Sequence, residues 1–275
     1  MLGSAIIVFR EVLEAALIIG IIAVATQGMP RRNFMLGCGI VAGIAGSLVV
    51  ASVTSRIADL ADGMGQELFN AAVLTTAALM LAWHNIWMSR HGMQLAQDAK
   101  KLGRAVASGD REMSALAAVI TLAVLREGSE TVLFLYGLFA GGSEPMLTIV
   151  GGGLVGSLLG ALAGYGLYAG FVRIPTRMFF SVTSGLILLL AAAMASQAAH
   201  YLIQADILPS LANPLWNSSW LLTDSSLPGR FLHTLIGYEA TPSGMQVLFY
   251  VSTLVAIATG MYLVRIQPNP QPTTH

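Results

Sequence analysis

Two short motifs place one arginine and two glutamates inside segments that are otherwise apolar. The sequence Arg-Glu-Val-Leu-Glu begins at Arg10, and the sequence Arg-Glu-Gly-Ser-Glu begins at Arg126. In a helix, two glutamates three residues apart lie on one face, about 4.5 Å apart along the axis. The arginine precedes the second glutamate by four residues and shares that face. Carboxylate oxygens gathered in this way are the ligands that hard cations prefer.

Burying these charges in hydrocarbon is costly, at least ~2.5–3.5 kcal/mol per residue, so intramembrane ionisable residues usually mark a functional path. If all six groups are ionised, the two motifs carry a formal charge of −2, which a divalent or trivalent cation would largely neutralise. A structural salt bridge between spans and a proton relay through the same carboxylates are the alternatives. We predict four metal ligands and two partner arginines: Glu11, Glu14, Glu127 and Glu130, with Arg10 and Arg126.

The composition indicates an all-α integral membrane protein. The chain has 275 residues, of which 55% are hydrophobic and only 10% are charged, whereas soluble domains have about 25% charged residues. Its apolar stretches are long enough to cross about 30 Å of hydrocarbon, and they are continuous, which excludes the alternating pattern of a β-barrel. The net charge of zero gives no basis for a nucleic-acid partner. The single cysteine, Cys38, excludes a disulfide framework and a cysteine metal site.

Seven membrane spans are predicted in one transmembrane domain covering residues 1–275. A cytoplasmic loop is expected at about 89–113 and a periplasmic loop at about 205–243. The outer loop contains Trp216 and Trp220, which are typical of an aromatic-belt element, an interfacial helix or a docking surface. The predicted spans are 3–28, 34–55, 67–88, 114–140, 146–171, 179–204 and 244–265.

Basic residues gather in alternate links between the spans. Arg31 and Arg32 follow the first span, a basic cluster at 90–111 follows the third, and Arg173 and Arg177 follow the fifth. By the positive-inside rule, the N-terminus lies outside and the C-terminus lies in the cytoplasm.

The motifs recur at a fixed spacing that predicts an internal repeat. Their offset is 116 residues (126 − 10), and His84 and His200 differ by the same number (200 − 84). Gly37 and Gly153 also share it. Three spans per copy require the second copy, about 114–204, to be inverted relative to the first, about 1–88. This is the plan of many secondary transporters, whose sites lie at the repeat interface. The last span stands outside the repeat.

The two histidines and the glycines receive separate interpretations. His84 is predicted near the inner end of the third span and His200 near the outer end of the sixth, where they could pass ions to and from the central site. Interfacial histidines facing headgroups are the alternative. Gly156 and Gly160 belong to a series of glycines at every fourth position of the fifth span, and Gly39 and Gly43 have the same spacing in the second. Such faces let helices approach closely.

The motif pair resembles that of the oxidase-dependent iron permeases, the membrane subunit of fungal high-affinity iron uptake and its bacterial EfeU-type relatives. That family has seven spans and carries Arg-Glu-Gly-Leu-Glu or close variants in the first and fourth. The resemblance implies that the four glutamates bind iron and that the protein carries it inward through the bacterial inner membrane. The iron is expected as Fe³⁺ supplied by a partner oxidase. It is a substrate, and no tightly bound cofactor is expected. The implied partners are a periplasmic cupredoxin-like protein and a haem peroxidase.

Other functions remain open on the sequence. A transporter of another metal such as lead or manganese would share every feature above. A structural membrane subunit would use the charged pairs only for assembly. An intramembrane enzyme is disfavoured, because the sequence has neither a His-Glu-x-x-His motif nor a serine–histidine dyad in an apolar context. It also has no nucleotide-binding motif that would indicate direct coupling to ATP.

Overall fold

Long α-helices form the described part of the molecule. The computed structural model describes residues 1–61, 65–140, 145–170 and 176–266, and these contain no strand. Arg173, one of the residues used to predict the orientation, lies outside them. The helices are α1 (Leu2–Ala25), α2 (Arg32–Ala61), α3 (Gln66–Ala107), α4 (Ser114–Ala140), α5 (Met146–Tyr168), α6 (Thr176–Gln204), α7 (Leu227–Ile236) and α8 (Gly244–Ile266).

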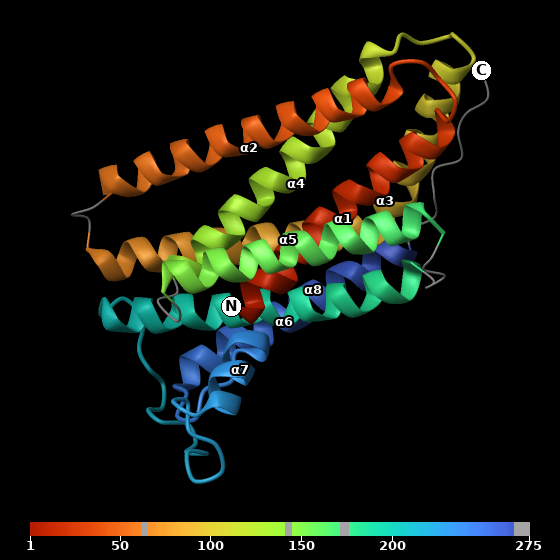
Figure 1. Cartoon of the computed structure of the whole chain (residues 1–275). Coiled ribbons are helices and arrows are strands. Elements are labelled where there is room, and N and C mark those ends of the chain that lie inside the picture. Colours follow the sequence, from red (N-terminus) through yellow and green to blue (C-terminus); the bar gives the residue numbers. More distant parts are fainter. Residues whose placement is uncertain (62–64, 141–144, 171–175, 267–275) are drawn as a thin grey trace.

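The seven long helices run up and down beside one another, and α7 lies at one end of the bundle (Figure 1). The polypeptide reverses direction between successive long helices. The end that carries α7 therefore also contains the start of α3, the end of α4 and the start of α8. The opposite end contains the C-terminal end of α1 and the start of α4. We refer to these as the α7 end and the opposite end.

Five helices of the described chain are long and apolar enough to cross a membrane. These segments are Arg32–Thr54, Gln66–Met88, Met146–Tyr168, Val182–Gln204 and Gly244–Val264. Helices α1 and α4, with 24 and 27 residues, have sufficient length but contain the three charged residues of a motif each. The architecture therefore agrees with the predicted all-α membrane protein.

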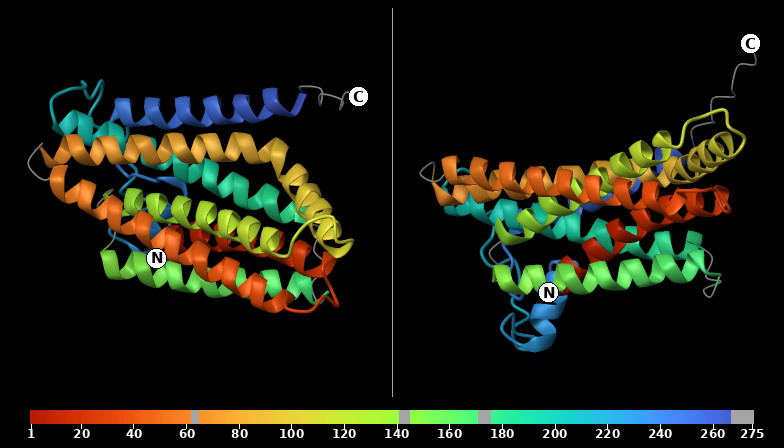
Figure 2. Two further views of the ribbon diagram at one scale, coloured as in Figure 1. Left: turned by 90° about the horizontal axis from the view of Figure 1, so that it is seen from above. Right: turned by 45° about the horizontal axis from the view of Figure 1, so that its top comes forward.

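Helix α3 is longer than the sequence pattern predicted. The third span was expected to end at residue 88, with a loop to 113, but α3 continues to Ala107. The added turns are polar, so the apolar stretch ends before the helix does. They contain no proline, and buried Ala99 and Val106 pack near the opposite end of the bundle. The left view of Figure 2 shows that α3 bends in its second half, and the part that is apolar enough to span a membrane is Gln66–Met88. Gly109, with φ of 86°, follows the end of the helix.

Glycine faces bring two pairs of helices into close contact, α1 with α5 and α2 with α4. A Cβ on Gly156 would collide with the backbone of Ala5 and Phe9 in α1. A Cβ on Gly43 would lie 2.6 Å from the Cβ of Val124 in α4. The predicted packing role of these glycine series is confirmed. Gly37 takes no part in it, because a Cβ there would meet nothing within 4 Å.

Two apolar clusters are arranged along the bundle. One contains Leu74, Phe134 and Leu190, from α3, α4 and α6. The other contains Ile22 and Leu116, from the C-terminal part of α1 and the N-terminal part of α4, and lies at the opposite end. The right view of Figure 2 shows α1 and α4 inclined relative to α5. Both motifs lie in the middle part of their helices.

Candidate metal centre

The two motifs, far apart in the sequence, meet inside the bundle. Glu11 of α1, His84 of α3, and Glu127 and Glu130 of α4 each offer one ligand atom, and these atoms all lie within 4.8 Å of one another. Glu11 is fully buried and His84 and Glu127 are each 3% exposed. The first motif, the second motif and the third helix therefore contribute jointly to one cluster.

The first motif is enclosed by protein. Arg10 is only 1% exposed, and its Nε lies 2.9 Å from Oε1 of Glu14, while Nη1 lies 3.6 Å from Oε1 of Glu11. Glu14 thus belongs mainly to the ion pair with Arg10 and is not one of the four clustered ligands. It remains near them, since its Oε2 lies 3.8 Å from Nε2 of His84.

The second motif has a more open arginine. The Arg126 side chain is 33% exposed, and its Nε donates a hydrogen bond of 3.2 Å to Oε1 of Glu130. The same Nε is 3.8 Å from Oε1 of Glu127. The guanidinium lies over the indole of Trp87, with Cζ 4.4 Å from the ring centroid, which is a cation–π geometry. The two arginines therefore hold the same position in their motifs but have different surroundings.

His84 belongs to the cluster itself, whereas the sequence predicted a residue that passes ions to or from a separate central site. Its Nδ1 contacts Oε2 of Glu130, and its Nε2 faces Glu14. The candidate membrane span in α3 is Gln66–Met88, so His84 does lie near the end of the span. What the sequence did not show is that this part of α3 packs beside both motifs.

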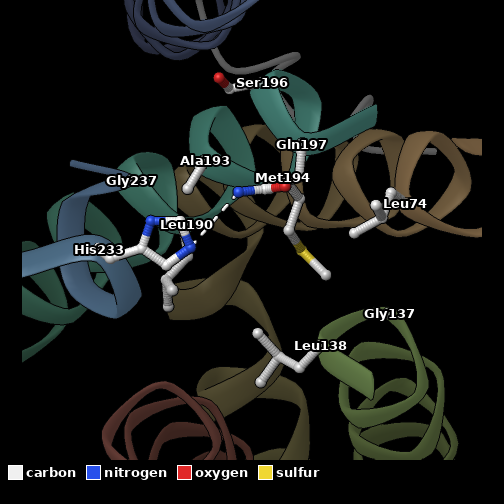
Figure 3. Close-up of a pocket in the computed structure, with 10 residues that line it drawn as sticks. All are labelled: Leu74, Gly137, Leu138, Leu190, Ala193, Met194, Ser196, Gln197, His233 and Gly237. Carbon is white, nitrogen blue, oxygen red and sulfur yellow. Dashed lines mark hydrogen bonds between the residues drawn. The ribbon is translucent and has the colours of Figure 1, made fainter. Parts of the chain in front are cut away.

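His200 is separate from this cluster. Its Nε2 lies 3.0 Å from the amide nitrogen of Gln204, one turn further along α6. Nearby, a small cavity of about 40 Å³ lies between α3, α4, α6 and α7, and it is lined by His233 and Gln197 but not by His200. Figure 3 shows the side chains of Gln197 and His233 directed at each other, with 3.4 Å between their nitrogens. The structure does not place His200 and His84 in one site.

Buried oxygen atoms in the cluster lack well-aligned hydrogen bonds within the described chain. Six carboxylate oxygens are in this position, both of Glu11, both of Glu14 and one each of Glu127 and Glu130, together with both ring nitrogens of His84. Arg10 and His84 form ion pairs with some of these atoms, but a buried group of carboxylates whose hydrogen bonds are incomplete is still expensive. A metal cation is the group that can satisfy several carboxylates and an imidazole at once, so the donor set fits a cation.

A larger cavity of about 580 Å³, open to the outside of the bundle at the exposed side chains of Leu79 and Trp83, adjoins the cluster on one side. His84, Trp87, Arg126 and Glu130 line its inner part, and Thr76 and Trp83 lie further along α3 toward the α7 end. Only one side of the cluster is therefore bordered by this open space, the side that Arg126 faces.

Sequence comparisons give the chain a set of relatives. The Iron permease FTR1 family matches residues 1–267. A protein of Yersinia pestis named Ferrous iron permease EfeU is 28% identical over 256 residues, which cover 91% of this chain and 89% of the relative. A protein of the same name from Shigella sonnei (strain Ss046) is 29% identical over 262 residues, 92% of this chain and 94% of the relative. No solved structure matches the chain.

Proposed function

Because the chain belongs to the iron permease FTR1 family, we propose that it carries iron inward across the cytoplasmic membrane through the site built by its two motifs. Its relatives are named as permeases, so it is a membrane transporter and not an enzyme. The observation that carries the proposal is the convergence of Glu11, His84, Glu127 and Glu130 within 4.8 Å in the interior of an apolar bundle.

The ligand set proposed from the structure is three glutamates and one histidine, with Glu14 behind them. Glu14 shares its charge with Arg10, and it can join the cation when the side chains rearrange. Arg10 and Arg126 offset the repulsion among the carboxylates before the cation arrives. The cation then replaces part of these ion pairs, because it contacts several oxygens at short distance.

The oxidation state divides the proposal into two forms. Four carboxylates fit hard Fe³⁺, the ion that the family resemblance implies, supplied by a partner oxidase. His84 favours a second form, because an imidazole nitrogen suits borderline divalent ions such as Fe²⁺. The names of the relatives from Yersinia pestis and Shigella sonnei also specify ferrous iron for those proteins.

An inverted repeat of α1–α3 and α4–α6, with α8 as the seventh span, is part of the proposal. The pair α1 with α5 has its counterpart in the pair α4 with α2. Equivalent residues also make these contacts: Ala5 and Phe9 of α1 face glycines of α5, and Thr121 and Leu125, 116 residues later, face glycines of α2. The proposed path lies where the two copies meet.

The proposed setting is the bacterial inner membrane, with the α7 end on the periplasmic side. Segment 205–243 and α7 then form a periplasmic surface on which a cupredoxin-like protein or a haem peroxidase could deliver iron. The basic cluster at 90–111 lies at the opposite end, in agreement with the positive-inside rule.

Radio-iron uptake into proteoliposomes tests the site. We expect the initial rate of iron uptake by the variant Glu11→Gln/Glu130→Gln to be at least tenfold lower than that of the parent protein, since the variant retains side-chain size and removes two ligand charges. Glu67→Gln, at the exposed start of α3, is the matched control and should transport normally. Unchanged uptake in the double variant, with insertion verified, would return the motifs to the structural interpretation.

The same assay separates the oxidation states and the metals. Iron is supplied either with ascorbate, or as ferric citrate with a chelator that removes Fe²⁺. Uptake only with ascorbate supports the ferrous form, and uptake only from ferric citrate supports the ferric form. Unlabelled manganese and lead are added as competitors. Competition by either at concentrations below that of iron would favour the alternative metal.

A further inference from the structure

We propose that the cavity between α3 and α4 is the route by which the cation reaches the glutamates, and that Arg126, resting on Trp87, is the gate on that route. This inference builds on the proposed function and adds a path and a positioning residue, Trp87, to it. The cavity joins two ligands, His84 and Glu130, to a space outside the cluster.

The space is a groove that opens on the outer face of the bundle, where Leu79 and Trp83 of its lining are 65% and 72% exposed. It extends along α3 from His84 to Thr76, which at 1.5 Å per residue is about 12 Å toward the α7 end. On the proposed topology, that is the periplasmic side.

The opposite end of the bundle is packed with apolar side chains. Ile22, Leu36, Val106, Leu116 and Ile120 are all buried there, from four different helices. On the α7 side the interior of the bundle is packed as well, by Leu74, Phe134 and Leu190. The open space that adjoins the glutamates is therefore the groove along α3 and α4, not the bundle interior.

The asymmetry of the arginines assigns the gate. Arg10 is sealed in protein and has no access to the cavity, whereas Arg126 is one-third exposed and lines it. Arg126 holds Glu130 through a hydrogen bond, so an arriving cation has to compete with this guanidinium for Glu130. The indole of Trp87 offers the guanidinium a second favourable contact. When Glu130 turns to the cation, Arg126 can stay on the indole of Trp87. Trp87 thereby makes it easier for the cation to displace Arg126 from Glu130.

Thiol labelling tests the route without iron. In a Cys38→Ser background, Thr76→Cys should react with a membrane-impermeant charged thiol reagent added outside. Leu48→Cys, exposed on α2 but not part of the cavity lining, should not react. A Thr76→Cys protein that is inert, or that reacts no faster than Leu48→Cys, overturns the route. Because no iron is present, this result does not depend on whether the glutamates bind it.

Uptake kinetics test the gate. Trp87→Leu removes the aromatic face, and we expect the KM for iron to rise about threefold to tenfold with little change in Vmax, the range a cation–π contact allows. Trp87→Phe keeps an aromatic face and should remain within about twofold of the parent. Trp220→Leu, 83% exposed in the outer segment, is the control. Equal effects of the Leu and Phe variants, or a fall in Vmax alone, overturn the gate.

Discussion

At the residue scale, the two motif arginines differ in what their removal would leave behind. Arg10 is in ion-pair contact with both Glu11 and Glu14, and all three are buried; His84 also lies 3.8 Å from Glu14. Arg126 borders open space, and Glu130 also contacts His84. The sequence motif is the same in both copies, so this difference could not be predicted from it.

We expect Arg10→Gln to destabilise the protein far more than Arg126→Gln. Removing one partner of a buried ion pair leaves uncompensated charge and costs about 3–5 kcal/mol. Thermal unfolding in detergent measures the difference, with both variants in the same preparation conditions. An equal loss in Tm would contradict the structural distinction between the arginines.

His84 is expected to set selectivity among divalent ions. His84→Gln replaces a nitrogen donor by an amide oxygen, and hard Mn²⁺ should then compete better with Fe²⁺, by severalfold, because oxygen ligands favour manganese. Competition uptake in proteoliposomes gives the ratio. His200→Gln, which changes a histidine outside the cluster, should leave the ratio as in the parent, and a shift of equal size there would refute the assignment.

At the element scale, glycine spacing decides how closely the helices approach. The fourfold periodicity in α5 was visible in the sequence, and Gly152, Gly156, Gly160 and Gly164 all lie buried in the structure. The helix that packs against these glycines could not be predicted from the sequence, because a face of small residues does not indicate which helix covers it. The glycine faces of α2 and α5 pack against α4 and α1 respectively, the helices that carry the motifs.

Two alanine substitutions in α5 separate packing from helix propensity. Gly156→Ala should destabilise by about 1–3 kcal/mol, because its methyl group meets the backbone of α1. Gly151→Ala meets nothing within 4 Å and should be neutral or stabilising by up to about 1 kcal/mol. Detergent melting curves report both, and a stabilised Gly156→Ala protein would show that α1 and α5 are not in close contact.

The segment between α7 and α8 is expected to respond to pH through Glu239. Burial raises the pKa of Glu239 above its usual range, against the opposing effect of His200 and His233. The folded state thus favours the protonated carboxyl. Its stabilising contribution is complete below the unfolded pKa of about 4.3 and is lost as pH rises through the higher folded pKa.

Glu239→Gln tests this pH response, because it removes the titration and leaves an amide beside Gln246. Melting temperatures of parent and variant, compared at pH 4 and pH 7.5, should show a smaller fall with rising pH in the variant. Parallel pH profiles would exclude a role for this carboxyl.

At the scale of the whole molecule, the topology places the two ends of the bundle on opposite sides of the membrane. In a Cys38→Ser background, Ser219→Cys in the outer segment should react with an impermeant thiol reagent in intact cells. Ser108→Cys, after the end of α3, should react only after permeabilisation. The reverse pattern would invert the proposed orientation and place the cavity on the cytoplasmic side.

The class of fold and the residues of the motifs could be predicted from sequence, because hydrocarbon penalises charge and leaves isolated arginines and glutamates conspicuous. The place of His84 in the cluster could not, since it depends on how α3 packs against α1 and α4. Glu14 and Glu130 likewise occupy the same position in their motifs, so the sequence does not distinguish them. Only the three-dimensional packing shows that Glu14 faces a sealed arginine and Glu130 a cavity.

The division of the candidate metal centre among α1, α3 and α4 also has a consequence for biosynthesis. The ribosome completes Glu130 116 residues after Glu14, and at about 5–20 residues per second this takes roughly 6–23 s. During that interval, α1 lies in the membrane with its one arginine and two carboxylates but without the helix that closes the cluster. The first half of the chain is therefore a vulnerable intermediate. A ribosome that stalls before α4 would leave a fragment that quality-control proteases should remove quickly.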